Sequence, residues 1–286
     1  ADVYRRVSDD LIGMRSLPGE NGFDYSTMNW AKLTNRGYEL SLSTVNVKTK
    51  DFRWVMDFNL AHNKSKINRL NVRDNSYEPS REGYSVGAVF SLKTAGLDEN
   101  GLQMFYNKQG EKVSFNDFFG LEYGYMMGGL IPFLKSNLSA EEYRNLFTYE
   151  GTTEPKFTGG WINRFYYKNF DLTVSASFVL DQTVQEQPFY NPVQTSPGQN
   201  YSRRMSQIWS PDNTSGKYPR IMGTYTEGEE NWAYQWLGML DPGNSYRKYD
   251  YWFKKMSYMR INSIRLGYTF PERLLGHIGF SSARIS

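Results

Sequence analysis

The sequence predicts an all-β fold, a section of about seven antiparallel strands from a transmembrane β-barrel with long extracellular loops. Residues 51–63 alternate between an apolar face with Trp54 and Phe58 and a polar face with Asp57 and Asn59, and this period of two is that of a β-strand. The pattern suits a soluble sandwich or a membrane barrel, so the lengths of the connections between strands must distinguish the two folds. Three of these connections are short. The connections between them are about 20, 90 and 70 residues long, whereas most connections in proteins have only a few residues. Tight turns at one end and very long loops at the other are typical of an outer-membrane barrel.

The composition fits such a barrel and excludes other classes of protein. No stretch of about 18 apolar residues occurs, which excludes a helical membrane protein. The 16% of aromatic residues suit a barrel, whose lipid face takes alternate residues and whose interfaces gather Tyr and Trp. A net charge of +3 without a basic block indicates no nucleic-acid partner. The absence of cysteine fits an exported bacterial protein, and no cofactor is expected.

Seven strands are expected in chain order. The third and fifth alternate most cleanly: in the fifth, Leu172 and Phe178 oppose Asp171 and Ser175. The outer faces of these strands are expected to meet lipid and the polar faces the barrel lumen. The expected strands are residues 1–12, 37–48, 51–63, 158–167, 170–180 and 254–270, and a seventh that begins near Phe280.

Two local features are predicted within these strands. In the sixth strand, Met259 and Ile261 are out of phase with Ile264, which predicts a β-bulge. The fourth and fifth strands are expected to form a hairpin across Lys168 and Asn169, where Asn169 can take a positive φ at modest cost.

The long connections carry structure of their own. Residues 83–115 alternate Gly turns with short apolar runs, which predicts a small extramembrane hairpin. Ser139 and Glu142 have the spacing of a capping box, which predicts a short helix over residues 140–147. The Gly-rich run Gly120–Phe133 is either a packed loop core or a docking surface.

An odd number of strands cannot stand alone in a membrane. An open sheet in lipid leaves unpaired backbone groups, each costing several kcal/mol. Residues 1–7 open directly in strand-like sequence, without a signal peptide. The chain is therefore expected to be a section of a larger barrel.

Five segments carry a family resemblance. In this order and spacing they resemble the C-terminal part of a SusC/RagA-type TonB-dependent transporter of the Bacteroidota outer membrane. Together they touch nearly the whole chain, whereas a single short motif such as Pro-Lys-x-x-Gly-Gly is not specific. The segments are YRRVSDDLI (4–12), NRGYELSLSTVNVKTKDFRWVMDFNLAHNKSKI (35–67), EGYSVGAVFSLKTAGLD with FYNKQGEKVS (82–114), EPKFTGGWINRFYYKNFDLTVSASF (154–178) and YWFKKMSYMRINSIRLGYTFPERLL (251–275).

The resemblance implies a 22-stranded barrel with an N-terminal plug, of which residues 1–286 are the C-terminal portion. The plug, the TonB box, the early strands and the final strand are then expected outside this chain. The resemblance also implies import of oligosaccharides or peptides across the outer membrane of a Gram-negative bacterium. The implied partners are a SusD-like surface lipoprotein that forms a lid, the TonB complex acting through the N-terminal part, and outer-membrane lipid.

The loop of residues 182–251 is the candidate binding surface, because aromatic residues alternate there with Asn, Gln, Ser and Gly. Flat rings stack on sugars or peptide side chains, and amides supply hydrogen bonds. The alternative is that these rings pack the loop against itself and against a lid. The residues expected to contact substrate or lid are Trp209, Tyr225, Trp232, Tyr234 and Trp236.

No catalytic or metal site is expected, and the protein is not expected to be an enzyme. His62 and His277 lack a nucleophile or metal ligand at useful spacing. Residues 212–216 lack the second acid and the downstream Glu of a calcium loop. Three alternatives remain open: a siderophore or vitamin receptor without a lid, a soluble carbohydrate-binding β-sandwich, and a glycan-degrading enzyme. The enzyme would need convergent carboxylates, and the adjacent acids of this sequence diverge in extended chain.

Overall fold

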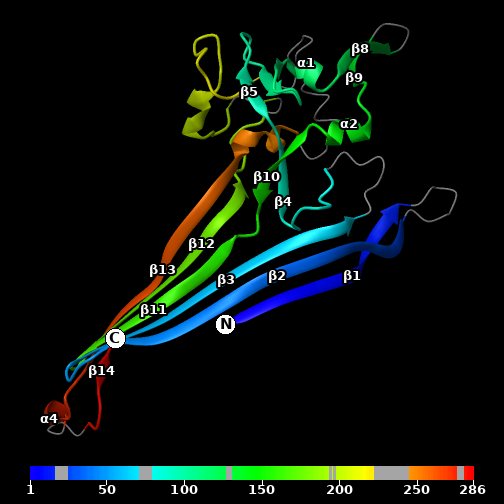
Figure 1. Ribbon diagram of the computed structural model, residues 1–286. Helices are drawn as coiled ribbons and strands as arrows, with labels where there is room; N and C mark the ends of the chain where they lie inside the picture. Colours follow the sequence, from blue (N-terminus) through cyan, green and yellow to red (C-terminus); the bar gives the residue numbers. More distant parts are fainter. Residues whose placement is uncertain are drawn as a thin grey trace.

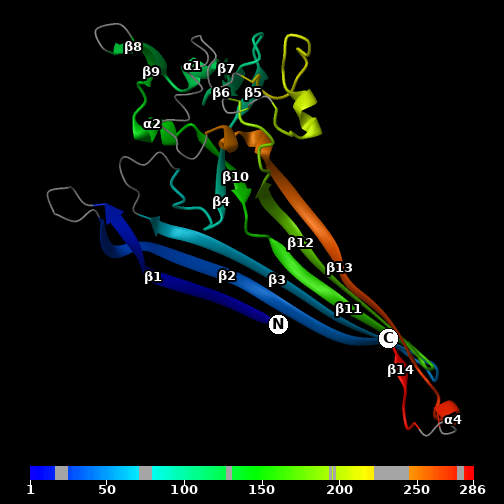
Figure 2. The same ribbon diagram turned by 180° about the vertical axis from the view of Figure 1, so that it is seen from behind.

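A seven-stranded sheet, in the order β1-β2-β3-β11-β12-β13-β14, forms the framework of the molecule. The computed structural model describes residues 1–16, 25–70, 79–126, 131–192, 195, 198–221, 245–275 and 280–286. Every neighbouring pair of strands is antiparallel. The strands converge at the end that carries the short turns, and the long connections gather beyond the opposite end (Figures 1 and 2). The seven antiparallel strands predicted from the sequence are confirmed.

Several strands extend further toward the long connections than predicted. β2 begins at Tyr25 rather than near residue 37, and β3 continues to Leu70. In these extensions the pairing continues with polar residues such as Lys32 opposite Arg69, so the apolar alternation fades while the backbone ladder persists. The strands of this sheet are β1 (Asp2–Ser16), β2 (Tyr25–Lys48), β3 (Phe52–Leu70), β11 (Phe157–Tyr167), β12 (Phe170–Gln185), β13 (Phe253–Thr269) and β14 (Arg284–Ile285).

The register separates apolar from polar residues on the two faces of the sheet. Trp54 lies opposite Phe165, which lies opposite Leu172, and the Trp54 and Phe165 rings stack with centroids 5.7 Å apart. On the other face, Arg164 forms an ion pair with Asp57. We call the first the outward face and the second the lumen face. The alternation places Trp54, Phe58, Leu172 and Phe178 on the outward face and Asp57, Asn59, Asp171 and Ser175 on the lumen face.

The short turn between β11 and β12 differs from the prediction in one residue. Lys168 has a φ of +51°, and Asn169 does not adopt a positive φ, so the prediction for Asn169 was wrong. Asn169 is bonded to β13 instead: its carbonyl accepts from the Thr269 amide at 2.9 Å, and its Nδ2 donates to the Thr269 carbonyl at 2.9 Å. These bonds fix Asn169, and the left-handed residue of the turn is therefore Lys168. Another short connection contains α4 (Glu272–Leu275).

The bulge predicted in β13 is confirmed. Ser175 lies opposite Ser263, whereas Ala176 lies opposite Ile261, so Asn262 is the extra residue. Its Oδ1 accepts from the Ser177 hydroxyl at 3.2 Å. The one-residue shift keeps the apolar residues before and after the bulge on the outward face.

The two long connections fold together into one body beyond the sheet, which we call the cap (Figure 1). The sequence predicted one hairpin over residues 83–115, but this segment contributes to two small sheets. One sheet has three strands that all lie within the segment, and the other is a pair whose second strand lies about 55 residues later in the sequence. The cap contains β4 (Ala88–Leu92) paired with β10 (Phe147–Thr152), the sheet of β5 (Thr94–Leu97), β6 (Gln103–Tyr106) and β7 (Lys112–Val113), the pair β8 (Leu121–Met126) and β9 (Ile131–Ser136), α1 (Phe115–Phe118), α2 (Ala140–Arg144), and the 3-10 turns η3 (Arg203–Gln207), η4 (Ser245–Lys248) and η5 (Asp250–Trp252).

A capping box begins α2, as predicted. The Glu142 amide donates to the Ser139 hydroxyl at 3.2 Å, and the Ser139 amide donates to the Glu142 carboxylate at 2.8 Å. This backbone hydrogen bond, followed by the one from the Ser139 hydroxyl, lowers the pKa of Glu142. The helix ends at Arg144 rather than near 147, because the chain enters β10 at Phe147.

The cap has its own hydrophobic core, drawn from both long connections. Leu92, Phe105 and Phe119 from the first, and Tyr249 and Trp252 from the second, are fully buried. Leu92 and Tyr249 also form a parallel β-bridge. Among the described residues, no helix is long and apolar enough to cross a membrane.

Candidate binding site in the cap

Aromatic rings of the second long connection form a packed cluster within the cap, next to the end of β12 and the start of β13. Tyr218 stacks on Trp252 with centroids 5.4 Å apart, and Phe189 lies edge-on to both rings at 5.0 and 5.8 Å. The Tyr190 hydroxyl donates to the Pro219 carbonyl at 2.6 Å. These rings pack the loop against itself, so for them the alternative stated from the sequence holds.

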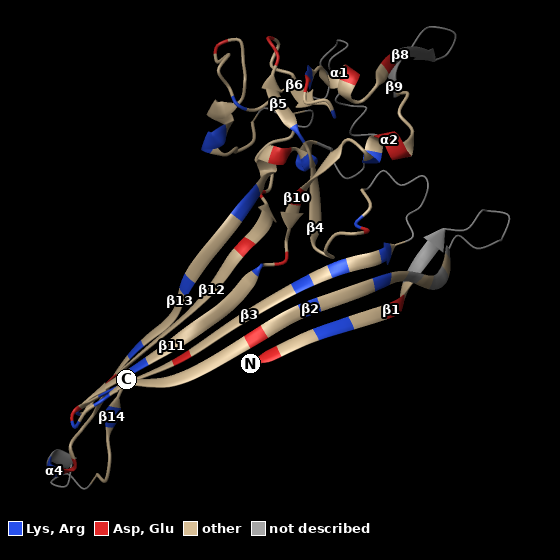
Figure 3. Ribbon diagram, viewed as in Figure 1, with Lys and Arg blue, Asp and Glu red and all other residues tan. Residues whose placement is uncertain are grey.

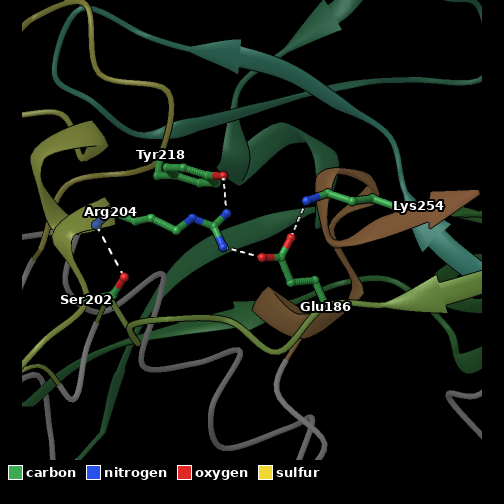
Figure 4. Close-up of polar contacts among 5 residues, drawn as sticks. All are labelled: Glu186, Ser202, Arg204, Tyr218 and Lys254. Atoms are coloured by element: carbon green, nitrogen blue, oxygen red, sulfur yellow. Dashed lines mark hydrogen bonds and ion pairs between the residues drawn. The ribbon is translucent and has the colours of Figure 1, made fainter. Parts of the chain in front are cut away.

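Arg204 links this aromatic cluster to the ends of the strands. Its guanidinium lies 4.5 Å from the centroid of the Phe189 ring, and Nη2 donates to the Tyr218 hydroxyl at 2.8 Å. Its Nη1 pairs with Glu186, which also pairs with Lys254 (Figure 4). Glu186 thus holds one cation from the loop and one from β13, and it fastens the loop to the sheet.

The charges of this network stabilise one another. The hydrogen bond from Lys254, reinforced by Arg204, lowers the pKa of Glu186 below its ordinary value of 4.5. Burial opposes the charge on Arg204, but the bonds to Tyr218 and Glu186 outweigh it and raise the pKa of Arg204. Glu186 and Arg204 are therefore both charged at neutral pH.

Sequence reasoning missed this network, although strand pairing offered a signal. Gln185 lies opposite Phe253 at the top of the β12–β13 ladder. Extending this ladder by one residue places Glu186 opposite Trp252, with Lys254 as its diagonal neighbour on the adjacent strand. Nothing in the sequence points to Arg204 as the third member, because its position depends on how the intervening loop folds.

A polar cavity of about 560 Å³ lies where the cap meets the sheet. Gly151 of β10 packs directly against Thr183 of β12 at this point, and the Ser65 hydroxyl of β3 donates to Glu154 at 2.6 Å. The walls offer both donors and acceptors, which suits an uncharged polar ligand more than an ion of one sign. The charged residues that line the cavity are Lys64, Glu150, Glu154, Lys156, Asp181 and Lys255.

Of the five residues predicted to contact substrate or lid, the structure describes Trp209. Its half-buried indole lies directly over Gly101, in the turn before β6, and its amide donates to the Tyr218 carbonyl at 2.9 Å. Trp209 therefore joins the two long connections within the cap, and its contact with a ligand stays a prediction. Tyr225, Trp232, Tyr234 and Trp236 lie outside the described residues.

The residues considered for catalysis and metal binding have structural partners. His62 lies between the Tyr38 and Phe157 rings, at centroid distances of 5.1 Å from each, and its Nδ1 donates to the Lys156 carbonyl at 2.5 Å. Asn213 uses its side-chain amide to hold its own loop. Across the described part of the chain, no three His, Asp or Glu residues gather as metal ligands would, and His277 lies outside that part.

Comparisons with known proteins agree with this architecture. The chain is 27% identical over 302 residues to TonB-dependent receptor P3 of Formosa agariphila, a match that covers 99% of this chain and 26% of that protein. It is 24% identical over 278 residues to the TonB-dependent receptor SusC of Bacteroides thetaiotaomicron, covering 95% of this chain and 24% of SusC. No family model matches.

The fold is also that of a solved transporter structure. The RagAB peptide transporter superposes with a TM-score of 0.66 at 18% identity, covering 99% of this chain and 28% of that one. The chain thus spans about a quarter of the length of the relatives it matches. Over nearly its whole length the chain is thus similar to TonB-dependent receptors that include SusC, and its seven-stranded sheet has the fold of a barrel segment of the RagAB transporter.

Proposed function

We propose that this chain is the C-terminal portion of an energised importer and forms part of its barrel wall and extracellular cap. A SusD-like lipoprotein would close over the cap, and the TonB complex would act through an N-terminal plug. The relatives are named as receptors and a transporter, which supports transport rather than catalysis.

The observation that carries this proposal is the cap itself. Two long connections that are separated in the sequence by β11 and β12 share one hydrophobic core above the sheet. A folded, aromatic-rich body offers a defined surface to a partner protein, which a mobile loop does not. A stable lid interface is expected to bury more than about 1,000 Å² in total.

Oligosaccharides or peptides are the substrate class that we propose. The cavity below the cap presents mixed donors and acceptors, as hydroxyl groups or a peptide backbone require. The described residues that flank the predicted contact residues, Ile221 and Ser245, both belong to the cap. This supports an extracellular position for the loop that carries Trp232 and Trp236.

The test is uptake and co-purification with the full-length protein in its own membrane. We expect Trp232→Ala with Trp236→Ala to release the lipoprotein or to lower uptake at least tenfold, because aromatic anchors dominate such interfaces. Deleting the TonB system should abolish uptake by the unmodified protein.

The matched control removes two aromatic rings at the opposite rim of the sheet. Tyr167 and Phe170 are about half exposed beside the β11–β12 turn, and Tyr167→Ala with Phe170→Ala should leave the partner bound. Normal uptake and normal lid binding by the Trp232→Ala, Trp236→Ala variant would show that these two residues do not contact the substrate or the lid. Uptake that persists without TonB would refute energised import.

A further inference from the structure

Three basic residues form a row across the outward face of the sheet near the cap. Arg5 of β1 lies opposite Arg36 of β2, which lies opposite Lys64 of β3. All three are exposed, and Figure 3 shows basic residues side by side on these three strands. We call Arg5, Arg36 and Lys64 the outward cation row.

The positive charge of this row is not neutralised by neighbouring carboxylates of the described chain. In the part of the chain that the structure describes, no carboxylate forms an ion pair with Arg5, Arg36 or Lys64. The nearest acids on these strands, Asp2 and Glu39, lie opposite each other on the lumen face. Directly opposed side chains in an antiparallel pair lie about 5 Å apart, and like charges at that spacing are destabilising. Such a row is expected where an external anion neutralises it.

The row lies at the level of lipid head groups. Twelve residues separate Phe52, beside the short turn, from Lys64. At about 3.3 Å per residue and a strand tilt of about 40°, Lys64 is about 30 Å from Phe52 along the membrane normal, just beyond an apolar band of about 25 Å. Tyr38 and His62 form the next row toward the band, as an interfacial girdle would.

The surface around the row is hollowed. A depression of about 620 Å³ is lined by the cation row, by Val3, Tyr38 and His62, and by Tyr4 and Gly37. All of these except Tyr4 and Gly37 lie on the outward face by the strand register. Cations at its upper edge and apolar and aromatic groups below match a phosphorylated lipid, with its phosphate held above and its acyl chains running down the apolar face.

We propose that the outward cation row is a binding site for lipopolysaccharide, through the phosphates of its lipid A. This glycolipid forms the outer leaflet of the Gram-negative outer membrane, in which the protein lies. Lys64 and His62 also line the polar cavity below the cap, so the test measures lipid binding and not uptake, and its outcome is distinguishable from that of the proposed function.

Lipid A binding to the full-length protein in detergent tests the site. The probes are hexa-acyl lipid A with two phosphates and the same lipid A after removal of its phosphates, and native mass spectrometry counts bound lipid. We expect the unmodified protein to bind the phosphorylated form and to lose most of this affinity with the dephosphorylated form. The triple variant combines Arg5→Gln, Arg36→Gln and Lys64→Gln. Its affinity for phosphorylated lipid A should fall on the order of 100-fold, because each lost cation lowers the affinity about fivefold.

The matched control removes three cations at the opposite rim: Lys48→Gln, Lys50→Gln and Lys168→Gln, which should leave lipid A binding unchanged. Heat-modifiable mobility on gels reports whether each variant is folded. If the triple variant does not fold, the three single variants replace it, each with an expected loss of about fivefold.

A second readout separates binding from general surface charge. In lipid-free detergent, removing the row should raise the melting temperature, because the repulsion between opposed cations is relieved. Equal binding of both forms of lipid A, or unchanged binding by the folded triple variant, would overturn the proposal. A protein subunit that occupies the row in purified complexes and is lost from the triple variant would also overturn it.

Discussion

Trp54 and Asn163 share a hydrogen bond on the outward face of the sheet. The indole Nε1 donates to the Asn163 Oδ1 at 2.9 Å, from β3 to the neighbouring β11. An amide oxygen that faces hydrocarbon without a donor is costly. The indole removes this cost, so an asparagine is tolerated among lipid-facing residues.

Replacing the indole should expose that cost. Trp54→Phe is expected to destabilise the folded barrel by about 1–3 kcal/mol, since the Asn163 oxygen loses its donor. In a background of Asn163→Leu, the same substitution should cost much less. Urea unfolding in lipid vesicles measures both effects, and additive values would show that the hydrogen bond contributes nothing to stability.

A positive charge should distinguish the two faces of the sheet. Phe58→Arg or Leu172→Arg should impair assembly, because a charge near the bilayer midplane costs roughly 2–4 kcal/mol. Ser175→Arg, on the lumen face, should be far milder. The heat-modifiable fraction in purified outer membranes reports assembly. Equal losses for Leu172→Arg and Ser175→Arg would contradict the assignment of the faces.

The Glu186 network should make the attachment of the cap sensitive to acid. The pKa of Glu186 is lowered in the folded state, so its stabilising contribution is complete above about pH 4.5, the ordinary pKa of Glu. The contribution is lost as the pH falls through the lowered value. The hydrogen-exchange protection factors of Arg203–Gln207, which compare the observed rate with the intrinsic rate at each pH, should therefore fall as the pH drops below about 4.5.

The control for the acid response lies within the cap. Glu186→Gln should accelerate exchange of Arg203–Gln207 already at neutral pH and should flatten its pH dependence. Glu141→Gln, on the exposed side of α2, should leave both unchanged. An identical acid response in Glu186→Gln would assign the effect to another group.

Gly101 should be the less replaceable of two glycines with the same backbone conformation. Gly101 and Gly110 have φ values of +75° and +80°, so alanine at either costs about 1 kcal/mol or more in backbone strain. A Cβ at Gly101 also meets the Trp209 ring, whereas one at Gly110 meets nothing within 4 Å. Thermal melting should show a larger loss for Gly101→Ala, by about 1–3 kcal/mol. Equal losses would mean that Trp209 moves aside freely.

The sheet could be predicted from the sequence because each strand carries its own signal. In β3 and β12 the alternation of Phe58 with Asp57, and of Leu172 with Asp171, fixes both the strand and its faces. The bulge at Asn262 was visible because it breaks this alternation. Where the strands leave the apolar band, as in β2 before residue 37, the signal fades and the boundary was missed.

The cap could be predicted only in part, because its contacts are not local. The capping box of α2 lies within four residues and was found. The burial of Phe105 against Tyr249, whose ring centroids are 5.2 Å apart, depends on chain segments that no periodicity connects. The Arg204 network was missed for the same reason. Of the five predicted contact residues, only the position of Trp209 could be compared.

The shared core of the cap makes the folding of the first long connection depend on the second. Leu92 and Phe105 are made long before Tyr249 and Trp252, which complete their burial. A chain interrupted before β13 would display these apolar side chains to water and to surface proteases. The cap therefore closes only in a chain that includes the residues leading into β13. A protease that recognises exposed apolar side chains would cleave an incomplete chain at this surface and spare a complete one.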